Sequence, residues 1–336
     1  MPGSIDVVML AYNRYELTDS CLRHLRAQTV DHHVIVVDNG STDDTRARLR
    51  AEWPALQLEQ LDENRGFAEA CNLGVAAGSA EIVVLINNDV NCRPDFLERL
   101  VAPMRDPTVG SVASLMLQPG GERIDCMGLA ADAILAGFPR LQGLPVAHSH
   151  DQRPVLAAPA GAAAAYRRAA WEQVGGLDET IVAYMEDFDL GLRLRTAGWR
   201  LVAAPDAIGV HLGSATHGFR SLWQRLQAGF GRGYVIRRYG LLRGRTAPRA
   251  LATEAVVVLG DLLLSRDLAA LRGRLAGWRA GRSRPRLPRP PAECVDRDIG
   301  FFDSLALRRG VYGRRTARAL ARKASVSSKA PGVPIS

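Results

Sequence analysis

Two stretches near the start of the chain decide the fold class: IDVVMLAYNR (residues 5–14) and VIVVDNGSTDDT (residues 34–45). Each is a short apolar run, rich in β-branched residues, that ends in polar turn formers. An amphipathic stretch at 17–25 lies between them. The same alternation continues, with helices expected at 45–53 and 66–77 and strands at 56–61 and 82–86. This order predicts an α/β fold in which helices cover both faces of the sheet.

Polar residues follow all four expected strands. They are Tyr12-Asn13-Arg14, Asp38-Asn39-Gly40-Ser41, Asn64-Arg65-Gly66 and Asn87-Asn88-Asp89. Any one of these groups could be an ordinary turn. In open α/β sheets, however, ligands bind beyond the carboxyl ends of the strands. Four such loops at one edge therefore indicate a ligand site.

The rest of the chain reads less regularly. Between residues 109 and 166 the periodicity weakens, so we expect irregular strands and a mobile loop near 138–155. Later elements are expected as a helix at 186–196, strands at 200–203 and 207–211, helices at 221–239, 248–264 and 267–280, and a linker at 282–291. We expect the last dozen residues to be disordered. This division predicts an α/β domain at 1–215 and a helical Arg-rich region at 216–336.

The charge is strongly uneven along the 336 residues. The formal net charge is +8, but residues 1–213 carry 18 basic and 28 acidic side chains, against 25 and 7 in residues 214–336. A basic block of this kind suits nucleic acid, an anionic membrane or an acidic protein partner, or it is a solvated helical face. No nucleic-acid-binding motif is recognisable, so we expect no nucleic acid partner.

Cysteine spacing and hydropathy indicate the compartment. The five cysteines are scattered singly, which suits neither a zinc site nor a disulfide framework and favours reduced thiols. The N-terminus does not resemble a secretory signal, and the run at 255–264 is too short to span a bilayer. We therefore expect a cytoplasmic protein, either free or peripheral at the inner face of the membrane. Whether it forms a homodimer is left open.

Seven ordered motifs carry a family resemblance. They are VVMLAYNR (7–14), VVDNGSTDDT (36–45), NRGFAEACNLGV (64–75), LINNDV (85–90), VGGLDE (174–179), YMEDFDLGLRLRTAGWRL (184–201) and IGVHLGSA (208–215). The series resembles family 2 glycosyltransferases of the GT-A fold, closest to the rhamnosyltransferase-like branch, over about residues 4–215. The resemblance implies a Rossmann-like mixed sheet with a helical basic extension. It also implies an inverting enzyme that transfers a sugar from a UDP- or dTDP-sugar to an acceptor hydroxyl or amine.

The resemblance places the nucleotide-sugar donor on the loops after the first three strands. Asp38 would accept a hydrogen bond from the pyrimidine imide, a contact that rejects bases lacking this donor. The main chain around Ala11, Tyr12 and Asn13 would pack on the nucleoside. Two further groups follow from the same resemblance: Asn64, Arg65 and Gly66 near the donor, and Arg14 near the diphosphate. Arg14 could instead form a surface salt bridge.

The resemblance also implies a divalent metal. Asn87-Asn88-Asp89 stands where the family has its D-x-D motif, with asparagine in place of the first acid. Asp89 is expected to bind Mn²⁺ or Mg²⁺, and Asn87 to contact ribose or diphosphate. His211 stands where relatives place a second ligand, although a lone histidine is often structural.

Three acids at the start of the helix expected at 186–196 are the candidates for chemistry. Carboxylates are favoured at helix N-termini in any case. By the resemblance Asp187 is the general base, Glu186 orients the acceptor, and Asp189 serves structure or the acceptor loop. Two alternatives remain. A nucleotidyltransferase should show a Gly-rich first loop, whereas this chain has AYNRYE, and a non-catalytic scaffold would not need Asp89, Asp187 and His211 together.

The basic tail is expected to dock the enzyme onto an anionic carrier of the acceptor. The carrier would be a membrane bearing a lipid-linked acceptor or an acidic carrier protein. The arginines expected to act are Arg220, Arg225, Arg232, Arg237, Arg238, Arg243 and Arg245, with Trp223, Phe230 and Tyr234 as an apolar face.

Overall fold

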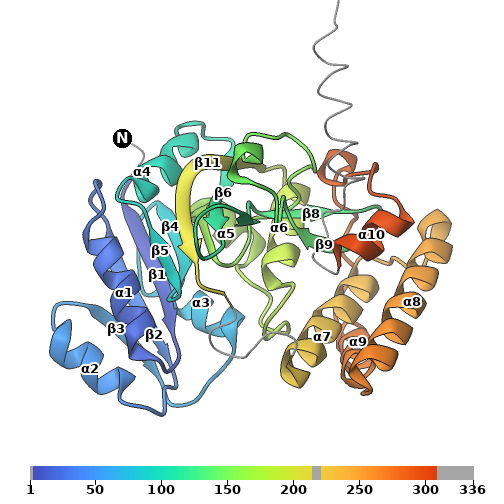
Figure 1. Cartoon of the computed structure of the whole chain (residues 1–336), viewed down its shortest axis with the longest axis horizontal. Coiled ribbons are helices and arrows are strands. Elements are labelled where there is room, and N and C mark those ends of the chain that lie inside the picture. The colour runs from blue at the N-terminus through green and yellow to red at the C-terminus, as the bar shows by residue number, and fades with distance from the viewer. Residues whose placement is uncertain (1–2, 214–220, 309–336) are drawn as a thin grey trace, which may run out of the picture.

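The computed structural model describes residues 3–213 and 221–308 (Figure 1). Its strands are β1 (Ile5–Ala11), β2 (His33–Asn39), β3 (Gln57–Leu61), β4 (Ile82–Asn87), β5 (Val90–Cys92), β6 (Val109–Leu117), β7 (Ile124–Cys126), β8 (Leu129–Ala131), β9 (Gly137–Pro139), β10 (Ala163–Arg167) and β11 (Arg200–His211). Its α-helices are α1 (Tyr15–Arg26), α2 (Thr45–Glu52), α3 (Phe67–Ala76), α4 (Phe96–Val101), α5 (Arg168–Val174), α6 (Glu186–Thr196), α7 (Leu222–Arg238), α8 (Ala247–Ser265), α9 (Ala269–Ala280) and α10 (Phe301–Leu307). Among these helices none is both long and apolar enough to cross a membrane.

The first half of the main sheet is parallel, in the order β3-β2-β1-β4. Successive side chains of a strand point to opposite faces, so β1 contributes to two cores. Val7 and Met9 share a cluster with Leu22 of α1, whereas Val8 packs with Val75 of α3 on the other face. The predicted α/β fold with helices on both faces is confirmed.

The second half makes the sheet mixed. β10 pairs antiparallel with both β4 and β6, β11 runs parallel to β6, and β5 closes the edge. The expectation of irregular strands after residue 109 is wrong for β6, which is a regular nine-residue strand with every residue buried. A strand buried on both faces has no polar alternation, which is why the sequence pattern missed it.

The two short strands expected at 200–203 and 207–211 form one strand, β11. Its pairing with β6 shifts register between Ala204 and Ile208, where Pro205 lacks the N–H that a regular ladder requires. The strand continues through this irregularity and delivers His211 to the carboxyl end of β6.

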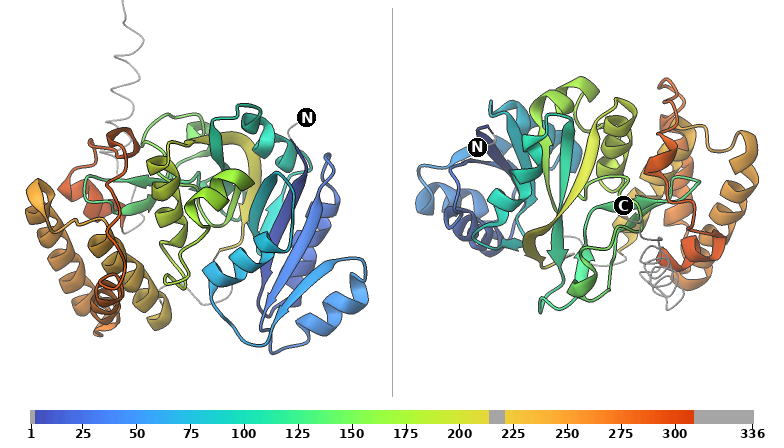
Figure 2. Two further views of the ribbon diagram at one scale, coloured as in Figure 1. Left: turned by 180° about the vertical axis from the view of Figure 1, so that it is seen from behind. Right: turned by 90° about the horizontal axis from the view of Figure 1, so that it is seen from above.

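The helices expected after residue 221 are present. α7 and α9 cross at close range because glycines face the opposite backbone: a Cβ at Gly233 would lie 2.0 Å from the Arg274 carbonyl oxygen. α8 lies outermost, on the side away from β1–β3 (Figures 1 and 2). Val235 of α7 and Tyr239, which follows directly after α7, share a core cluster with Phe188 of α6. The predicted domain boundary at 215–216 and the predicted disordered end lie outside the described residues, so both stay predictions.

Much of the basic charge of the helical region is structural, which corrects the expected docking face. Arg232 and Arg238 are buried, and Arg225 pairs with Asp267. Tyr234 is fully buried, so α7 does not present the apolar face predicted for it. Of the seven arginines expected to act, Arg243 and Arg245 are exposed, Arg237 lies over the Trp278 ring, and Arg220 lies outside the described residues.

One buried acid organises these arginines. Glu254 of α8 forms ion pairs with Arg232 at 2.7 Å, Arg274 at 2.9 Å and Arg308 at 3.2 Å. Burial alone would raise the pKa of Glu254, but the three guanidinium groups outweigh it and hold the pKa well below its usual range. The carboxylate therefore ties α7, α9 and the end of α10 to α8.

We expect Glu254→Gln to lower the free energy of unfolding by about 3–5 kcal/mol at pH 7, because three buried cations lose their counter-charge. Because the folded pKa is depressed, this contribution is fully present above the unfolded pKa of about 4.3 and is lost as the pH falls towards the folded pKa. Urea unfolding at several pH values tests this, with the exposed Glu293→Gln as the control. Equal unfolding of Glu254→Gln and wild type at pH 7 would contradict it.

Candidate active site

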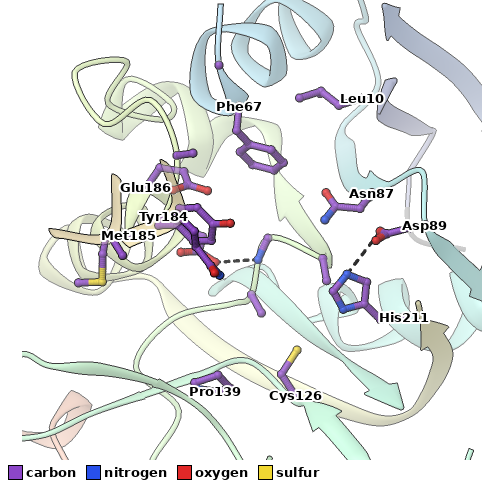
Figure 3. Close-up of a pocket in the computed structure, with 18 of the residues that line it drawn as sticks. Leu10, Phe67, Asn87, Asp89, Cys126, Pro139, Tyr184, Met185, Glu186 and His211 are labelled. Atoms are coloured by element: carbon purple, nitrogen blue, oxygen red, sulfur yellow. Dashed lines mark hydrogen bonds and ion pairs between the residues drawn. The ribbon is translucent and has the colours of Figure 1, made fainter. Parts of the chain in front are cut away.

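A cavity of about 560 Å³ lies where β1 and β4 end, beneath the start of α6 and the first turns of α7 (Figure 3). Figure 3 shows Tyr184 and Glu186 on one wall and Asn87, Asp89 and His211 on the opposite one. Nine predicted site residues line this cavity: Tyr12, Asn64, Gly66, Asn87, Asn88, Asp89, Glu186, Asp187 and His211. The carboxyl edge of the sheet therefore gathers most of the predicted site.

Six predicted residues do not line the cavity: Ala11, Asn13, Arg14, Asp38, Arg65 and Asp189. Asn13 and Arg14 both have a positive φ of 56° and fasten the loop after β1 to the loop after β2. The Asn13 N–H donates to Ser41 Oγ at 2.8 Å, and the Arg14 N–H donates to Asp43 Oδ2 at 2.8 Å. Arg65 is half-exposed and pairs with Glu69 at 3.0 Å.

Asp38 is fully buried behind the cavity wall. Its Oδ1 accepts the Ser41 N–H at 3.0 Å, and its Oδ2 pairs with Arg46 Nε at 2.6 Å. Arg46 also donates to the Leu61 carbonyl at 2.7 Å, which joins the ends of β2 and β3. Asp38 therefore positions the loops, and its predicted contact with a pyrimidine stays a prediction.

Asn39, the next residue, lines the cavity instead. Its side chain accepts the Arg65 N–H at 2.9 Å and donates to the Gly66 carbonyl at 3.0 Å. Gly66 has φ 86°, and a Cβ there would lie 2.9 Å from the Val182 carbonyl oxygen. The loop after β3 is thus held against the segment that precedes α6, and a side chain at Gly66 would separate them.

Asp89 and His211 form the pair predicted to bind metal. β5 pairs antiparallel with β11, which brings Asp89 Oδ1 within 3.4 Å of His211 Nε2. Asp89 Oδ1 is buried, and His211 is the one side chain of the described residues that approaches it, as expected of an atom placed for an ion. His211 Nδ1 lies 2.8 Å from Asp125 Oδ2. Burial alone would lower the pKa of His211, but the carboxylates of Asp125 and Asp89 outweigh it and raise the pKa to about 10.

Asp125 is a site residue that the sequence did not reveal. It lies at the centre of β7, 86 positions before His211, in the region where periodicity is weak. A carboxylate on the second ring nitrogen fixes the orientation of a metal-binding histidine and raises its basicity. No spacing rule in the sequence connects the two residues, so the fold alone brings them together.

Asp187 stands at the first turn of α6 with both oxygens held by backbone donors. Oδ2 accepts the Gly161 N–H at 2.8 Å, and Oδ1 accepts the Phe188 N–H at 2.7 Å. Burial nevertheless raises the pKa of Asp187. Glu186 beside it is buried, with Oε2 unpaired, and burial together with the charge of Asp187 raises its pKa well above the usual range. Raised carboxyl pKa values in a cavity are typical of acid–base sites.

The backbone before these acids is in an unusual conformation. Tyr184 and Met185 have φ values of 64° and 82°, in the left-handed region that such residues avoid. The start of α6 is held there by α7, since a Cβ at Gly231 would lie 2.4 Å from the Tyr184 carbonyl oxygen. Strained residues of this kind cluster at functional sites.

Asp189 has a structural role, the first of the two roles expected for it. It is fully buried, pairs with Arg193 at 2.7 Å and accepts the Tyr239 hydroxyl at 3.0 Å. These contacts join α6 to α7. With no exposed surface, Asp189 does not reach the cavity.

The remaining wall of the cavity is apolar and aromatic. Phe67, Leu129, Pro139, Tyr184 and Trp223 line it. The Tyr184 and Trp223 rings pack edge to face with centroids 6.0 Å apart. Trp223 was expected from the sequence to lie on an exposed apolar face that contacts a membrane. Its place in the cavity corrects that prediction.

A parallel half-sheet with convergent loops, joined to a mixed half whose strand β11 brings His211 to Asp89, is the arrangement expected of the GT-A fold. Residues 6–175 match the family model described as "Glycosyl transferase family 2", and the chain belongs to this family. The resemblance seen in the sequence is confirmed.

Two relatives illustrate the family. An N-acetylglucosaminyl-diphospho-decaprenol L-rhamnosyltransferase of Mycobacterium tuberculosis is 31% identical over 201 residues, covering 53% of this chain and 66% of the relative. The O-antigen biosynthesis protein RfbC of Myxococcus xanthus is 28% identical over 223 residues, covering 63% and 17%. The chain thus spans less than two thirds of either relative.

Solved structures share the fold. A Pyrobaculum calidifontis mannosyltransferase in complex with GDP-Man and Mn²⁺ aligns with a TM-score of 0.54 and 22% identity, covering 95% of this chain and 84% of that one. GalNAc-T7 with UDP, GalNAc and Mn²⁺ aligns with a TM-score of 0.57 and 13% identity, covering 84% and 55%. At these identities the likeness concerns the fold.

Proposed function

We propose that this protein is an inverting, metal-dependent glycosyltransferase that moves a sugar from a UDP- or dTDP-sugar to an acceptor hydroxyl or amine. One observation carries the proposal: a single cavity holds the Asp89–His211 pair on one wall and the Asp187 carboxyl group on the other. The segment 160–162 fixes their separation. Its Gly161 N–H donates to Asp187, and its Ala162 carbonyl accepts the Asn87 N–H at 2.9 Å.

The residues present fit a divalent metal. Asp89 would offer its buried Oδ1, and His211 would offer Nε2, which lies 3.4 Å from that oxygen and must release its proton when the ion binds. Asp125 holds the imidazole ring in place. Among described residues no cluster of three protein ligands exists, so nucleotide and water oxygens would complete the shell. When bound, Mn²⁺ or Mg²⁺ supplies charge neutralisation on the diphosphate leaving group. No arginine or lysine of the described chain lines the cavity, so a bound ion would add positive charge that these side chains do not supply.

The donor would occupy the wall formed by the loops after β1, β2 and β3. Tyr12, Asn39 and Asn64 lie there, and Asn39 and Asn64 are joined by a hydrogen bond between their loops. Asn87 and Asn88 follow β4 at the centre, and Asn88 is oriented by a hydrogen bond to Thr18 at 3.0 Å. These amides suit ribose hydroxyls and diphosphate oxygens.

Asp187 would act as the base. As the acceptor oxygen or nitrogen bonds to the anomeric carbon, the bond from that carbon to the diphosphate oxygen breaks, and the acceptor proton passes to a carboxylate oxygen of Asp187. Attack opposite the leaving group inverts the anomeric configuration. A raised pKa brings the carboxylate closer to the working pH, where general bases are most effective.

We propose a lipid-linked glycan as the acceptor. The name of the mycobacterial relative includes a diphospho-decaprenol acceptor and an L-rhamnosyl group. A nucleotide-linked rhamnose is therefore the first donor to test with this protein. The apolar wall with Trp223 and Tyr184 suits the faces of an acceptor sugar.

The nucleotidyltransferase alternative predicts a different ligand preference. Thermal shift with UDP, dTDP and their sugars, each with Mn²⁺, tests it, since a ligand at a hundred times its Kd stabilises by about 2.7 kcal/mol. We expect stabilisation by the diphosphates and nucleotide sugars that disappears in EDTA. Stabilisation by nucleoside triphosphates alone would contradict the proposal.

Asp125→Ala is expected to weaken Mn²⁺ binding in the presence of UDP by about 10- to 100-fold, because His211 loses the partner that orients it. Calorimetric titration of Mn²⁺ measures this directly. The matched control is Asp151→Ala, which removes a similar carboxylate 2.9 Å from the exposed His148. Equal Mn²⁺ affinity in Asp125→Ala and wild type would exclude the role given to Asp125.

A further inference from the structure

The outermost helix of the molecule is apolar on its exposed side. Of twelve large apolar side chains that are exposed in the described chain, nine lie on α7–α9 and their junctions. Six belong to α8: Leu251, Val256, Leu259, Leu262, Leu263 and Leu264. Leu263 is 68% exposed and Leu264 71%. Clustered exposure of this kind marks an interaction surface.

These side chains form a patch and are not scattered. Val256, Leu259 and Leu263 are spaced by three and four residues and therefore lie along one side of the helix. Leu262, Leu264 and Leu268 extend it round the corner into α9. We call Val256, Leu259, Leu262, Leu263, Leu264 and Leu268 the α8 patch.

Exposed arginines bracket the α8 patch. Arg243 and Arg245 precede α8, Arg266 follows it, and Arg272 lies one turn into α9. None of these four guanidinium groups forms an ion pair within residues 3–213 or 221–308. Residues 221–308 contain 17 arginines against seven acidic residues. The patch is thus apolar at its centre and basic at its ends.

One end of the α8 patch is connected to the wall of the active-site cavity through α7. Arg225 of α7 forms an ion pair with Asp267, in the turn between α8 and α9. Two residues before Arg225, Trp223 lines the cavity, and Leu222 next to it is 61% exposed. An object bound to the patch would therefore lie near the aromatic wall of the cavity.

We propose that the α8 patch docks the protein onto an anionic lipid bilayer. A helix with an apolar side and flanking basic residues lies in the plane of the interface, with its apolar side chains in the headgroup–acyl boundary. Each basic residue near an anionic surface adds attraction. A second copy of this chain fits less well, since a symmetric contact would oppose the arginine-bearing ends of the two patches. The consequence that the cavity opens towards a lipid-linked acceptor rests on the proposed function, whereas the docking itself does not.

Vesicle sedimentation with the full chain tests the docking. We expect binding to phosphatidylglycerol-containing vesicles that weakens with added salt and is much weaker on phosphatidylcholine alone. Leu263→Ser/Leu264→Ser should lower partitioning about tenfold or more, although its charge is unchanged. Arg266→Gln/Arg272→Gln should remove most of the preference for anionic vesicles. Phe302→Ser, which alters a 75% exposed side chain on α10, is the matched control and should bind as wild type.

Donor hydrolysis in vesicle-free solution separates this proposal from the catalytic one. The Leu263→Ser/Leu264→Ser variant should retain wild-type hydrolysis and thermal stability, because both side chains are exposed. The docking proposal would be overturned if wild-type protein did not bind anionic vesicles. It would also be overturned if the leucine variant bound them as well as wild type. A wild-type dimer that the leucine variant converts to a monomer, without vesicle binding by either, would assign the patch to a second copy instead.

Discussion

Replacing Asp187 by asparagine should lower turnover by about a hundredfold or more while nucleotide-sugar binding stays nearly intact. The amide cannot take the acceptor proton, yet it keeps the shape of the side chain and can still accept the Gly161 N–H. Steady-state rates, with donor affinity measured separately by calorimetry, provide the test. Glu172→Gln on α5 is a control that removes an exposed acid away from the cavity.

The pH dependence of wild-type activity provides a second test of the role of Asp187. The base must be ionised, so activity should be lost as the pH falls through its pKa. Because burial raises the pKa of Asp187, this loss should begin at a higher pH than the ordinary aspartate value of about 3.9 implies. An Asp187→Asn enzyme with a tenth or more of wild-type turnover would exclude Asp187 as the base.

Chelation and the Asp89→Ala substitution should each abolish activity, but only the chelated wild type should regain activity when metal is added. EDTA-treated wild type should recover on addition of Mn²⁺ or Mg²⁺, whereas Asp89→Ala should not recover at any metal concentration, because the carboxylate ligand is missing. Thermal shift gives a readout independent of turnover, since Mn²⁺ should enhance stabilisation by UDP in wild type and not in the variant. Undiminished activity in chelator would contradict the metal proposal and the role of His211.

The sequence predicted the parallel half of the sheet well because its signals are local. Apolar runs alternate with amphipathic helices up to residue 87, and each polar loop follows directly on its strand. Parallel pairing then brings the loops together without further information. Of the nine predicted site residues that line the cavity, six come from these loops: Tyr12, Asn64, Gly66, Asn87, Asn88 and Asp89.

The mixed second half of the sheet could not be predicted in the same way. β6 is buried on both faces, so it shows no alternation, and Asp125 approaches His211 through pairings between distant segments. The prediction that the arginines of the basic tail form a docking face was wrong for a related reason. Arg232 is one of several charges that read as solvated in the sequence but are neutralised by Glu254 in the fold.

For Asp38, the role implied by the sequence motif differs from the contacts that the residue makes in the structure. The sequence motif assigns the residue to the nucleotide base, whereas its oxygens contact Ser41 and Arg46 behind the wall. Asn39 occupies the cavity surface beside it. Comparing UDP affinity in Asp38→Asn and Asn39→Ala would separate a direct base contact from support of the loop.

Release of UDP or dTDP from a nucleotide sugar in the absence of acceptor tests the central claim most directly. This hydrolysis is expected to be many-fold slower than transfer to the acceptor, but it still requires the donor site and the metal. We predict that wild-type protein with Mn²⁺ releases the nucleoside diphosphate from at least one UDP- or dTDP-sugar, that EDTA stops the release, and that Asp89→Ala shows none. No release above the enzyme-free rate across a panel of such sugars, or release of nucleoside monophosphate with sugar phosphate, would contradict glycosyl transfer as the function of this cavity.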